Sequence, residues 1–479
     1  MSRVKVGWGC VFSGLLVLLP AGGAAAEDTA DAARPLTIVV VGDTGLNRTM
    51  QPVVSRGGYK HGRLIPWDRM LDGIRAEIDG DLNVLNLETV VTARNDLRPE
   101  AKTFRFRSHP EGVRQLVRQG FNLFSLANNH SMDFGAEGAR ETIKAVEEMK
   151  ADGLLAHAGL GLTYEDAAKA HVVAVRGTRI AFAAIGITTQ GFPHHRAGPD
   201  RPGQLSYRSD EDFAEVVRRL KDAQADYRIL SVHYGPELSV SPDNYDRDRL
   251  RRRAVQEAGI DLVLGHHAHV AAGIETVDGR AVFYGLGNFL HWGTQDMRKF
   301  GPCRDWGLMA RLRLMRADGG RLTLRAIEAI PLAGMHDHVA RHKEAEARKR
   351  IAVLNSLSAG LGNAKAGGED VRFAVRPDGT GVYCPPGFVP PAADLMRGRS
   401  GSAADGSIEA VCAAAAAQTA VRAAGNVSCG PIAFHRSDPE AASRRARSRV
   451  APYRPGVRPR VARKRRSSPA SGETAGWEW

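Results

Sequence analysis

The stretch DLVLGHHAHV at residues 261–270 begins as a short apolar run and ends in three histidines, His266, His267 and His269. A run of this length, rich in Val and Leu, is typical of a strand that is buried on both faces. The histidines come at its end, and imidazole is a common ligand of metal ions in proteins. This stretch therefore predicts a buried strand that delivers metal ligands to a loop.

Four other segments share this plan of an apolar run that ends in polar side chains able to bind a metal. They are LTIVVVGDTGLNR at 36–48, LNVLNLET at 82–89, FNLFSLANNHSMDFG at 121–135 and RILSVHYGPE at 228–237. Parallel strands bring their carboxyl ends to one edge of an α/β sheet, where such folds bind ligands. The side chains so delivered are Asp43, Glu88, Asn129, His130, His233, His267 and His269.

Each of these residues, taken alone, has a simpler interpretation. A strand-end Asp or Asn is more often a turn former or a helix cap, because its short side chain bonds nearby backbone amides. Capping does not explain five such sites together, since caps require neither imidazole nor clustered carboxylates. Carboxylates, amide oxygens and imidazoles are the ligands of one or two Mn, Fe or Zn ions. The joint pattern therefore predicts a metal centre.

Six motifs in this order carry a resemblance to a known family. GDTGLNR, NLET, LANNHSMDFG, VHYGPE, GHHAHV and YGLGNFL resemble the successive motifs of the CapA family of capsule proteins, which is associated with poly-γ-glutamate synthesis. The resemblance spans residues 36–335 and includes AKTFRFRSHP at 101–110, which is similar to the family's Lys-x-x-Phe segment. The family is in turn similar to calcineurin-like metallophosphoesterases. This implies an α/β fold of two packed sheets flanked by helices, with a site for two divalent metal ions.

Carried over by position, the resemblance also implies roles for individual residues. His130 matches the catalytic histidine of the phosphoesterase Gly-Asn-His motif, and imidazole exchanges protons near neutral pH. Arg48 is either a fork-like clamp for an anionic group or a surface residue, and Glu237 is expected to orient a ligand or polarise water. The implied metal ligands are Asp43, Glu88, Asn129, His233, His267 and His269.

Other residues of similar chemistry receive different predictions. Asn288, in the last motif, is expected to orient a ligand or polarise water. Asp133 is expected to cap the helix that begins near Gly135, although the resemblance places it by the site. Histidines without a preceding strand are expected at the surface or in loops. These are His109, His171, His194, His195, His336, His338 and His342.

The resemblance predicts a function in capsule synthesis, on poly-γ-glutamate or a related acidic polymer and together with other capsule-synthesis proteins. Two alternatives stay open. The first is a metallophosphoesterase for a periplasmic or cell-surface phosphoester, although Gly45, Glu88 and Ser131 depart from the phosphoesterase pattern. The second is a non-catalytic scaffold that binds acidic polymer.

The two ends of the chain differ in composition from the rest. Residues 1–26 contain Arg3, Lys5, an apolar stretch and an Ala-x-Ala site, which predicts a secretory signal that is cleaved or retained as an anchor. We therefore expect an exported protein, in the periplasm or at the cell surface. Eleven cations and two acidic residues lie at 444–479, so this segment contributes +9 to the formal net charge of +13.

This charge distribution decides which partners the sequence favours. Residues 441–479 have almost no apolar content and are expected to form a disordered basic tail. Such a tail attracts acidic polymer, anionic lipid or cell-wall phosphate, or serves only solubility. The remaining chain is nearly neutral, so nucleic acid is not an expected partner.

Periodicity and cysteine count predict the remaining organisation. A metal-binding domain is expected at 36–335 and a helical or irregular appendage at 336–440. Cys303, Cys384, Cys412 and Cys429 permit two disulfides in three pairings, and at least one bridge is expected to fasten the appendage. Amphipathic stretches between the apolar runs predict helices and an α/β architecture. They lie at 67–78, 111–119, 135–149, 210–224 and 245–258.

Overall fold

The computed structural model describes most residues between 35 and 386, and residue 429. The described residues are 35–47, 53–54, 63–64, 67–386 apart from 293, 295–296, 318–319, 337 and 363–367, and residue 429. All of them belong to the unit Met1–Gly430. The predicted signal, Arg48, and the predicted tail lie outside the described residues. Among the described helices, none has both the length and the apolar character that crossing a membrane requires.

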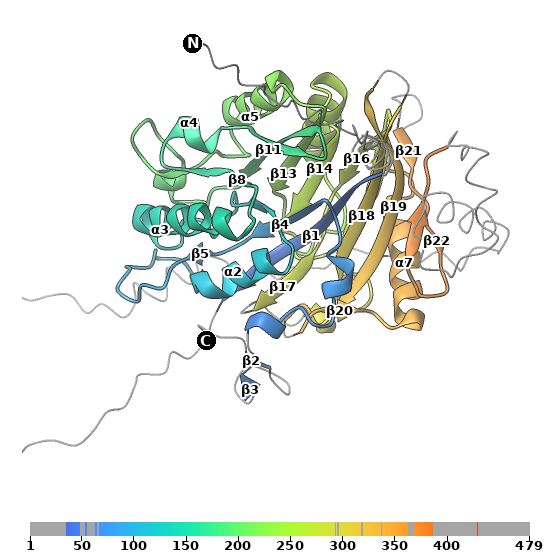
Figure 1. Cartoon of the computed structure of the whole chain (residues 1–479), viewed down its shortest axis with the longest axis horizontal. Coiled ribbons are helices and arrows are strands. Elements are labelled where there is room, and N and C mark those ends of the chain that lie inside the picture. The colour runs from blue at the N-terminus through green and yellow to red at the C-terminus, as the bar shows by residue number, and fades with distance from the viewer. Residues whose placement is uncertain are drawn as a thin grey trace, which may run out of the picture. The chain divides into compact units, whose positions relative to one another are not determined.

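Two large β-sheets form the centre of the described structure (Figure 1). The larger sheet has the order β22 (Ala374–Val375), β23 (Gly381–Tyr383), β19 (Leu322–Ala333), β18 (Gly307–Arg316), β1 (Leu36–Leu46), β4 (Leu82–Leu87), β7 (Leu123–Ser125) and β8 (Ala156–Ala158), with β17 (Asn288–Trp292) paired to β1 and β20 (Ala340–Arg341) to β19. The smaller sheet has the order β10 (His171–Val175), β11 (Thr178–Gly186), β13 (Tyr227–His233), β14 (Leu262–His266), β16 (Arg280–Phe283), β15 (Ile274–Val277) and β21 (Gly368–Asp370).

Short strand pairs stand beside these sheets. They are β2 (Val53–Val54) with β3 (Arg63–Leu64), β5 (Val90–Val91) with β6 (Arg107–Ser108), and β9 (Leu160–Gly161) with β12 (Gly203–Gln204).

The five apolar runs of the sequence form parallel strands at the middle of the two sheets. In the larger sheet β1, β4 and β7 run parallel, and in the smaller sheet β13 runs parallel to β14. Their carboxyl ends therefore meet at one edge of each sheet. This arrangement confirms the predicted fold class of two packed sheets flanked by helices.

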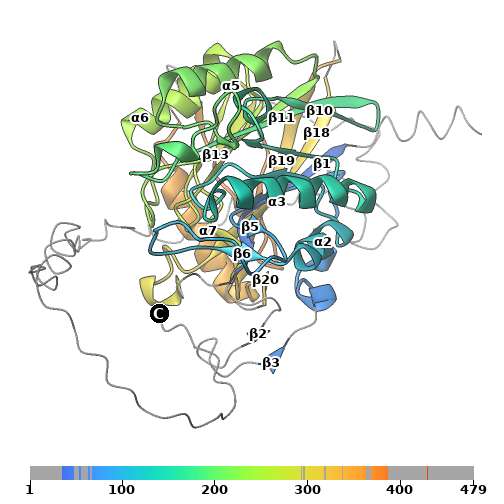
Figure 2. The same ribbon diagram turned by 90° about the vertical axis from the view of Figure 1, so that its left-hand side faces the viewer.

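Alternate residues of each strand fill two different cores, which explains why the runs are apolar throughout. On β1, Ile38 and Val40 pack between the two sheets, against residues such as Phe182 of β11. Val39 and Val41 point the other way, into a core that lies under helices. Figure 2 shows the sheets from the side on which helices α2 (Pro110–Arg118) and α3 (Gly135–Glu148) cover the larger one.

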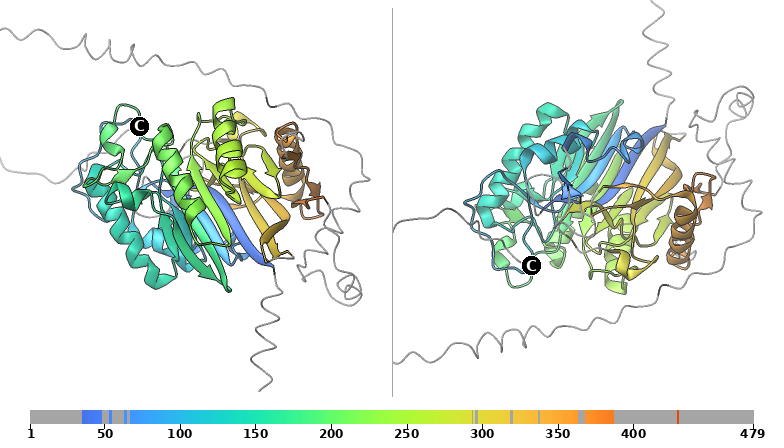
Figure 3. Two further views of the ribbon diagram at one scale, coloured as in Figure 1. Left: turned by 90° about the horizontal axis from the view of Figure 1, so that it is seen from above. Right: turned by 90° about the horizontal axis from the view of Figure 1, so that it is seen from below.

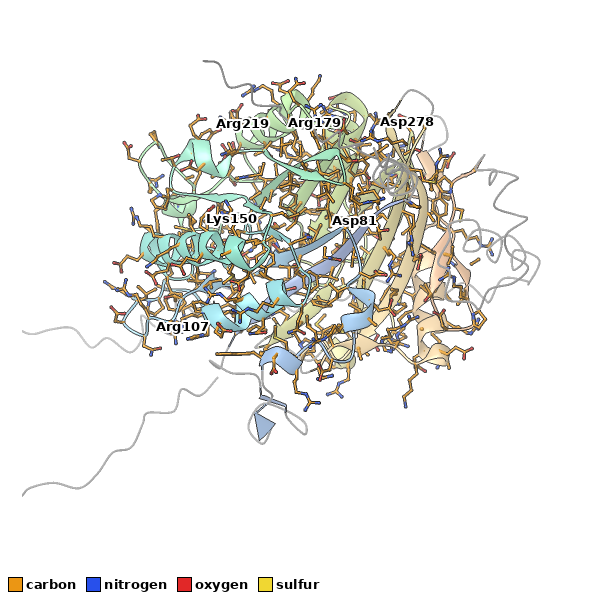
Figure 4. The ribbon with its side chains drawn as sticks, in the orientation of Figure 1. Asp81, Arg107, Lys150, Arg179, Arg219 and Asp278 are labelled. Carbon is orange, nitrogen blue, oxygen red and sulfur yellow. A yellow bond between two sulfur atoms is a disulfide. The ribbon has the colours of Figure 1, made fainter. Side chains whose placement is uncertain are left out.

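Helices cover the outer faces of both sheets (Figure 3). α5 (Asp210–Asp222) begins after Ser209, whose hydroxyl accepts a hydrogen bond from the Asp212 N–H at 3.2 Å. Arg219 of α5 and Lys150 beyond α3 lie on these outer layers (Figure 4). The other helices are α4 (Tyr164–Ala167), α6 (Asn244–Arg247) with a π-helical continuation over Asp248–Glu257, and α7 (Glu344–Ser358).

One predicted helix is wrong. The stretch 67–78 forms only two 3₁₀ turns, Trp67–Arg69 and Arg75–Glu77. Gly73 lies between them, and a Cβ at that position would come within 2.8 Å of the Val339 carbonyl oxygen. Glycine disfavours a continuous helix, and the close approach of the backbone near Val339 requires it here.

The sheets continue past residue 335, where the sequence predicted the domain to end. β21 extends the smaller sheet, and β22 and β23 extend the larger one beside β19. A disulfide joins Cys303 to Cys429, which confirms that a bridge fastens the C-terminal segment to the domain. Cys384 is also disulfide-bonded. Cys412 lies outside the described residues.

Candidate metal centre

The ends of five strands from both sheets bring the predicted ligands together. Asp43 lies on β1, Glu88 follows β4, and His233 ends β13. All three side chains are fully buried, with no exposure to solvent. His267 and His269 follow β14, and the backbone N–H of His267 donates to Asp43 Oδ2 at 3.2 Å. The two sheets therefore meet at these residues.

Asp43 is held as a carboxylate by the groups around it. Its Oδ1 accepts a hydrogen bond from Asn86 Nδ2 at 2.8 Å, and its Oδ2 lies 3.2 Å from His269 Nδ1. Burial and the charge of Glu88 raise the pKa of Asp43, but the neighbouring imidazoles of His266 and His269 outweigh them and hold this pKa below its usual range. The carboxylate is thus available to a cation at neutral pH.

Glu88 presents a buried oxygen without a hydrogen-bond partner. Its Oε2 accepts from His291 Nε2 at 2.9 Å, whereas Oε1 has no hydrogen bond and lies 3.3 Å from His233 Nε2. Burial raises the pKa of Glu88, but the charges of His269 and His233 hold it well below its usual value. A buried, ionised oxygen without a partner is what a site for a cation provides.

Asn129 and the histidines complete a crowded set of ligand atoms. His233 Nε2 lies 2.7 Å from Asn129 Oδ1 and 3.0 Å from His267 Nδ1. Burial, and then the charges of His233 and His269, hold the pKa of His267 well below its usual value. His267 is therefore neutral at pH 7, the form that binds metals.

The ligand atoms form two groups that share one carboxylate. Ligand atoms of Glu88, His233 and His267 lie within 4.8 Å of one another, and so do those of Asp43, Glu88 and His269. Two neighbouring divalent ions bound by carboxylates and imidazoles require this kind of arrangement. The residues present therefore fit a centre of one or two divalent ions, with Glu88 common to both groups.

The loop that carries the two histidines has an unusual backbone. His267 and His269 have φ values of 88° and 57°, in the left-handed region that residues other than glycine rarely adopt. Each such residue costs about 1–3 kcal/mol and persists where the surrounding structure requires it. The adjacent contact of His269 Nδ1 with Asn288 Oδ1 at 2.9 Å holds that ring in place, as predicted for Asn288.

His130 lies beside this centre with its own carboxylate partner. His130 Nδ1 lies 2.6 Å from Asp133 Oδ2, and the Phe106 ring stacks on the imidazole at 4.0 Å. Asp133 also accepts a hydrogen bond from the Phe106 N–H at 2.6 Å and forms an ion pair with Lys102. Lys102 Nζ in turn donates to the Asn129 carbonyl oxygen at 2.5 Å.

The prediction that Asp133 caps a helix is therefore wrong. Helix α3 follows Phe134, which makes no side-chain capping hydrogen bond. A short carboxylate serves a cap and a histidine equally well, so the sequence around Asp133 could not distinguish the two roles. The buried partners His130 and Lys102 decide it.

Of the other two predicted catalytic residues, the structure describes only Glu237. Glu237 is exposed, and its charge acts on His269 from a distance by raising the pKa of that ring. Arg48 lies outside the described residues. His195 lies in a loop, as predicted, but its side chain is buried there, in a 3₁₀ turn.

Sequence reasoning missed several residues that support the ligands. Asn86 lies within the NLET motif and bonds both Asp43 and His233. His291 lies inside β17, without the strand-end position that identified the other histidines. Lys102 lies in the segment at 101–110, and only its burial beside Asp133 ties it to the site.

The comparison with known families decides which proteins this chain is related to. The family described as "Bacterial capsule synthesis protein PGA_cap" matches residues 37–292. The chain belongs to this family. The match covers more than half of the chain and includes every candidate ligand, and the predicted resemblance to CapA is confirmed.

Relatives with related names are similar over part of their length. The chain is 28% identical to the capsule biosynthesis protein CapA of Bacillus anthracis, over 53% of this chain and 59% of that protein. It is 30% identical to the PGA biosynthesis protein CapA of Bacillus subtilis (strain 168), over 43% and 52% respectively. The match thus spans little more than half the length of each relative.

Among solved structures, the chain is similar to the calcineurin-like phosphoesterase YfkN from Bacillus subtilis. The TM-score is 0.37 and the sequence identity 12%, over 67% of this chain and 97% of that chain.

Proposed function

We propose that this chain is an exported, metal-dependent protein of capsule synthesis that acts on poly-γ-glutamate or a related acidic polymer. Membership of the capsule synthesis family and the names of two relatives support the polymer class. The Cys303–Cys429 disulfide supports export, because such bonds persist in oxidising compartments. The observation that carries the metal dependence is the pair of ligand groups that share Glu88.

The ligands assigned by this proposal come from both sheets. Bound divalent ions would activate water and polarise a carbonyl or phosphoryl oxygen of the substrate. Asn86 and Asn288 hold Asp43 and His269 in position through their amides. The ligands are Asp43, Glu88, Asn129, His233, His267 and His269.

In this proposal His130 transfers the proton. Asp133, which forms an ion pair with Lys102, accepts the hydrogen bond from His130 Nδ1 and so leaves Nε2 to exchange a proton with the reacting group. Stacking on Phe106 fixes the plane of the ring. Asp133 and Lys102 are positioning residues in this scheme, since they act through His130.

The acidic polymer and the basic segment are complementary in charge. We assign residues 441–479, with eleven cations, to a salt-sensitive attraction for acidic polymer or for an anionic membrane or wall surface. Truncation after Ser443 should weaken polymer binding at low salt and leave turnover of saturating substrate unchanged. Loss of both polymer binding and function in capsule synthesis on this truncation would favour a scaffold over an enzyme.

A polymer assay with purified full-length protein tests the proposal. The protein is stripped of metal, reloaded with Mn²⁺, Fe²⁺ or Zn²⁺, and incubated with poly-γ-glutamate, whose chain length is followed by gel filtration. We expect a metal-dependent change in chain length that His130→Gln abolishes and His171→Gln, on the edge strand β10, retains.

Other outcomes of this assay would replace the proposal. Unchanged polymer together with His130-dependent hydrolysis of an aryl phosphate would show a phosphoesterase. Unchanged polymer and unchanged aryl phosphate, in protein that retains its metal, would refute catalysis and leave a polymer-binding scaffold.

A further inference from the structure

A second cluster of ligand-type side chains lies outside the metal centre. Glu100 lies in the loop before β6, and His194 and His195 form the 3₁₀ turn Pro193–His195 in the loop after β11. One ligand atom from each of these three residues lies within 4.8 Å of the other two. None of the three belongs to the ligands assigned above.

His195 is the buried member of this cluster and lacks a hydrogen-bond partner at Nε2. Its side chain is 1% exposed, and Phe192 stacks on the ring with centroids 4.9 Å apart. Its Nε2 makes no hydrogen bond and lies 3.8 Å from Glu100 Oε1. That separation is too long for a hydrogen bond, so the buried nitrogen faces a carboxylate without bonding it.

The spacing of the three ligand atoms fits one tetrahedral ion. Zinc binds His nitrogen and Glu oxygen at about 2.0–2.2 Å, so two of its ligand atoms lie roughly 3.3–3.5 Å apart. Glu100 Oε1 lies 3.0 Å from His194 Nε2 and 3.8 Å from His195 Nε2, on either side of that value. Two histidines and one glutamate with an open fourth position are an established set of zinc ligands.

At neutral pH, His195 is in the unprotonated form that a metal ion requires. Burial, followed by the nearby positive groups His194 and Lys102, lowers the pKa of His195 to about 4. His195 is therefore neutral at pH 7 and has a free lone pair on one ring nitrogen. The charge of Lys102 is already balanced by its ion pair with Asp133.

Both loops of the cluster are attached to the segment that carries His130. The Glu100 N–H donates to the Asp133 carbonyl oxygen at 2.9 Å, and Thr189 Oγ1 donates to the Asn129 carbonyl oxygen at 3.1 Å. An ion at the cluster would therefore fasten two loops from different sheets next to His130, without sharing a ligand with the metal centre.

We propose that Glu100, His194 and His195 bind a zinc ion that joins the loop after β11 to the loop before β6. This site goes beyond the proposed function and does not depend on it, because its test measures metal binding and stability rather than turnover.

Zinc stoichiometry of the full-length protein tests this site. Metal-stripped wild type and His194→Gln are saturated with Zn²⁺, desalted and analysed by inductively coupled plasma mass spectrometry. We expect His194→Gln to hold one zinc ion fewer per chain, because removing a ligand should weaken the site at least roughly tenfold. His194 is 49% exposed, so the substitution leaves the core intact. His171→Gln is the matched control and should retain the wild-type zinc content.

A variant that lacks two ligands of the metal centre distinguishes zinc binding at this site from zinc binding at the centre. The double variant His267→Ala, His269→Ala should still bind one zinc ion, and Zn²⁺ should raise its melting temperature. Adding His194→Gln should remove both effects. Equal zinc content in wild type and His194→Gln, or a cooperatively unfolding double variant that binds no zinc, would overturn the proposal.

Discussion

Asp43 and Glu88 place two ionised carboxylates in the same fully buried region. Among single residues, this pair points most strongly to a bound cation. Two buried like charges repel each other strongly and require compensation. In the metal-free protein the imidazoles of His269 and His291 supply it by bonding these oxygens. A divalent ion would replace the proton on His269.

The protonation state of His269 predicts how many protons metal binding releases. Burial lowers the pKa of His269, but the charge of Glu88 and the hydrogen bond with Asp43 raise it to about 10. The ring is thus protonated at pH 8 in metal-free protein, and a metal must displace that proton. We expect release of about one proton per chain on metal binding at pH 8. Calorimetry in buffers of different ionisation enthalpy measures it, and an uptake or no exchange would contradict the assignment.

The raised pKa of His269 also predicts how the stability of the metal-free protein changes with pH. Because the pKa of His269 is higher in the folded protein than in the unfolded chain, its contribution is fully present below about pH 6.5 and is lost as the pH rises through about 10. We expect metal-free wild type to lose free energy of unfolding across this window. His269→Gln should lose less over the same window, as measured by urea unfolding. An identical pH profile for the two proteins would show that His269 is not protonated in the fold.

Asp133 should affect His130 without affecting the metal. Asp133→Asn removes the carboxylate that fixes His130 Nδ1 and leaves Lys102 buried without its counter-charge. We expect turnover to fall by about 10²–10⁴, the contribution of a general acid or base, while metal content stays at the wild-type value. Asp72→Asn, which removes an exposed ion pair with Arg69, is the control. Unchanged turnover in Asp133→Asn would remove His130 from the mechanism.

The candidate ligands could be predicted from the sequence because each follows a strand that is apolar on both faces. Their supporting residues could not. Asn86 and His291 acquire their roles only when β1 pairs with β4 and with β17, which no local pattern records. Lys102 and Asp133 face each other across a loop, so their ion pair depends on the tertiary structure.

At the level of elements, the close approach of β1 and β17 positions Asp43. A Cβ on Gly42 would lie 1.8 Å from the Gly287 carbonyl oxygen, and the Asp43 N–H donates to that oxygen at 2.9 Å. Both contacts involve backbone atoms, so neither can move aside easily. Glycine is therefore required at residue 42, immediately before the first ligand.

Gly42→Ala should therefore disturb both the fold and the metal site. We expect a loss of about 3 kcal/mol or more in the free energy of unfolding, the upper range for overpacking, together with weaker metal binding. Gly198→Ala is the matched control, because the nearest atom to its added Cβ is 3.5 Å away, an ordinary contact. Chemical unfolding and metal titration of both variants give the comparison. Equal stability of Gly42→Ala and wild type would show that β1 and β17 are not packed this closely.

Elements with a long, regular pattern were predictable, and short ones were not. The helices α2, α3 and α5 follow from amphipathic spacing and lie close to their predicted bounds. β21 has three residues and β22 has two, too few to carry a periodic signal. Their strand conformation follows from pairing with β15 and β23.

At the scale of the whole unit, one covalent bond links distant parts of the chain. The Cys303–Cys429 disulfide closes a loop with a sequence separation of 126 residues. Neither cysteine is a candidate ligand. We expect Cys303→Ser, Cys429→Ser to lower the free energy of unfolding by about 2–5 kcal/mol and to leave the metal content unchanged. Urea unfolding measures the stability, and metal analysis measures the metal content. Loss of metal from the folded variant would show that the metal site depends on the disulfide.

We propose that residues from both sheets meet around Glu88 and hold divalent ions there. Diffraction data from a crystal of the Mn²⁺-saturated protein, collected at a wavelength at which manganese scatters anomalously, locate such ions directly. We predict one or two anomalous peaks, each within bonding distance of Glu88 and of His267 or His269. Ordered side chains at Asp43, Glu88 and His267 without an anomalous peak between them would contradict the account.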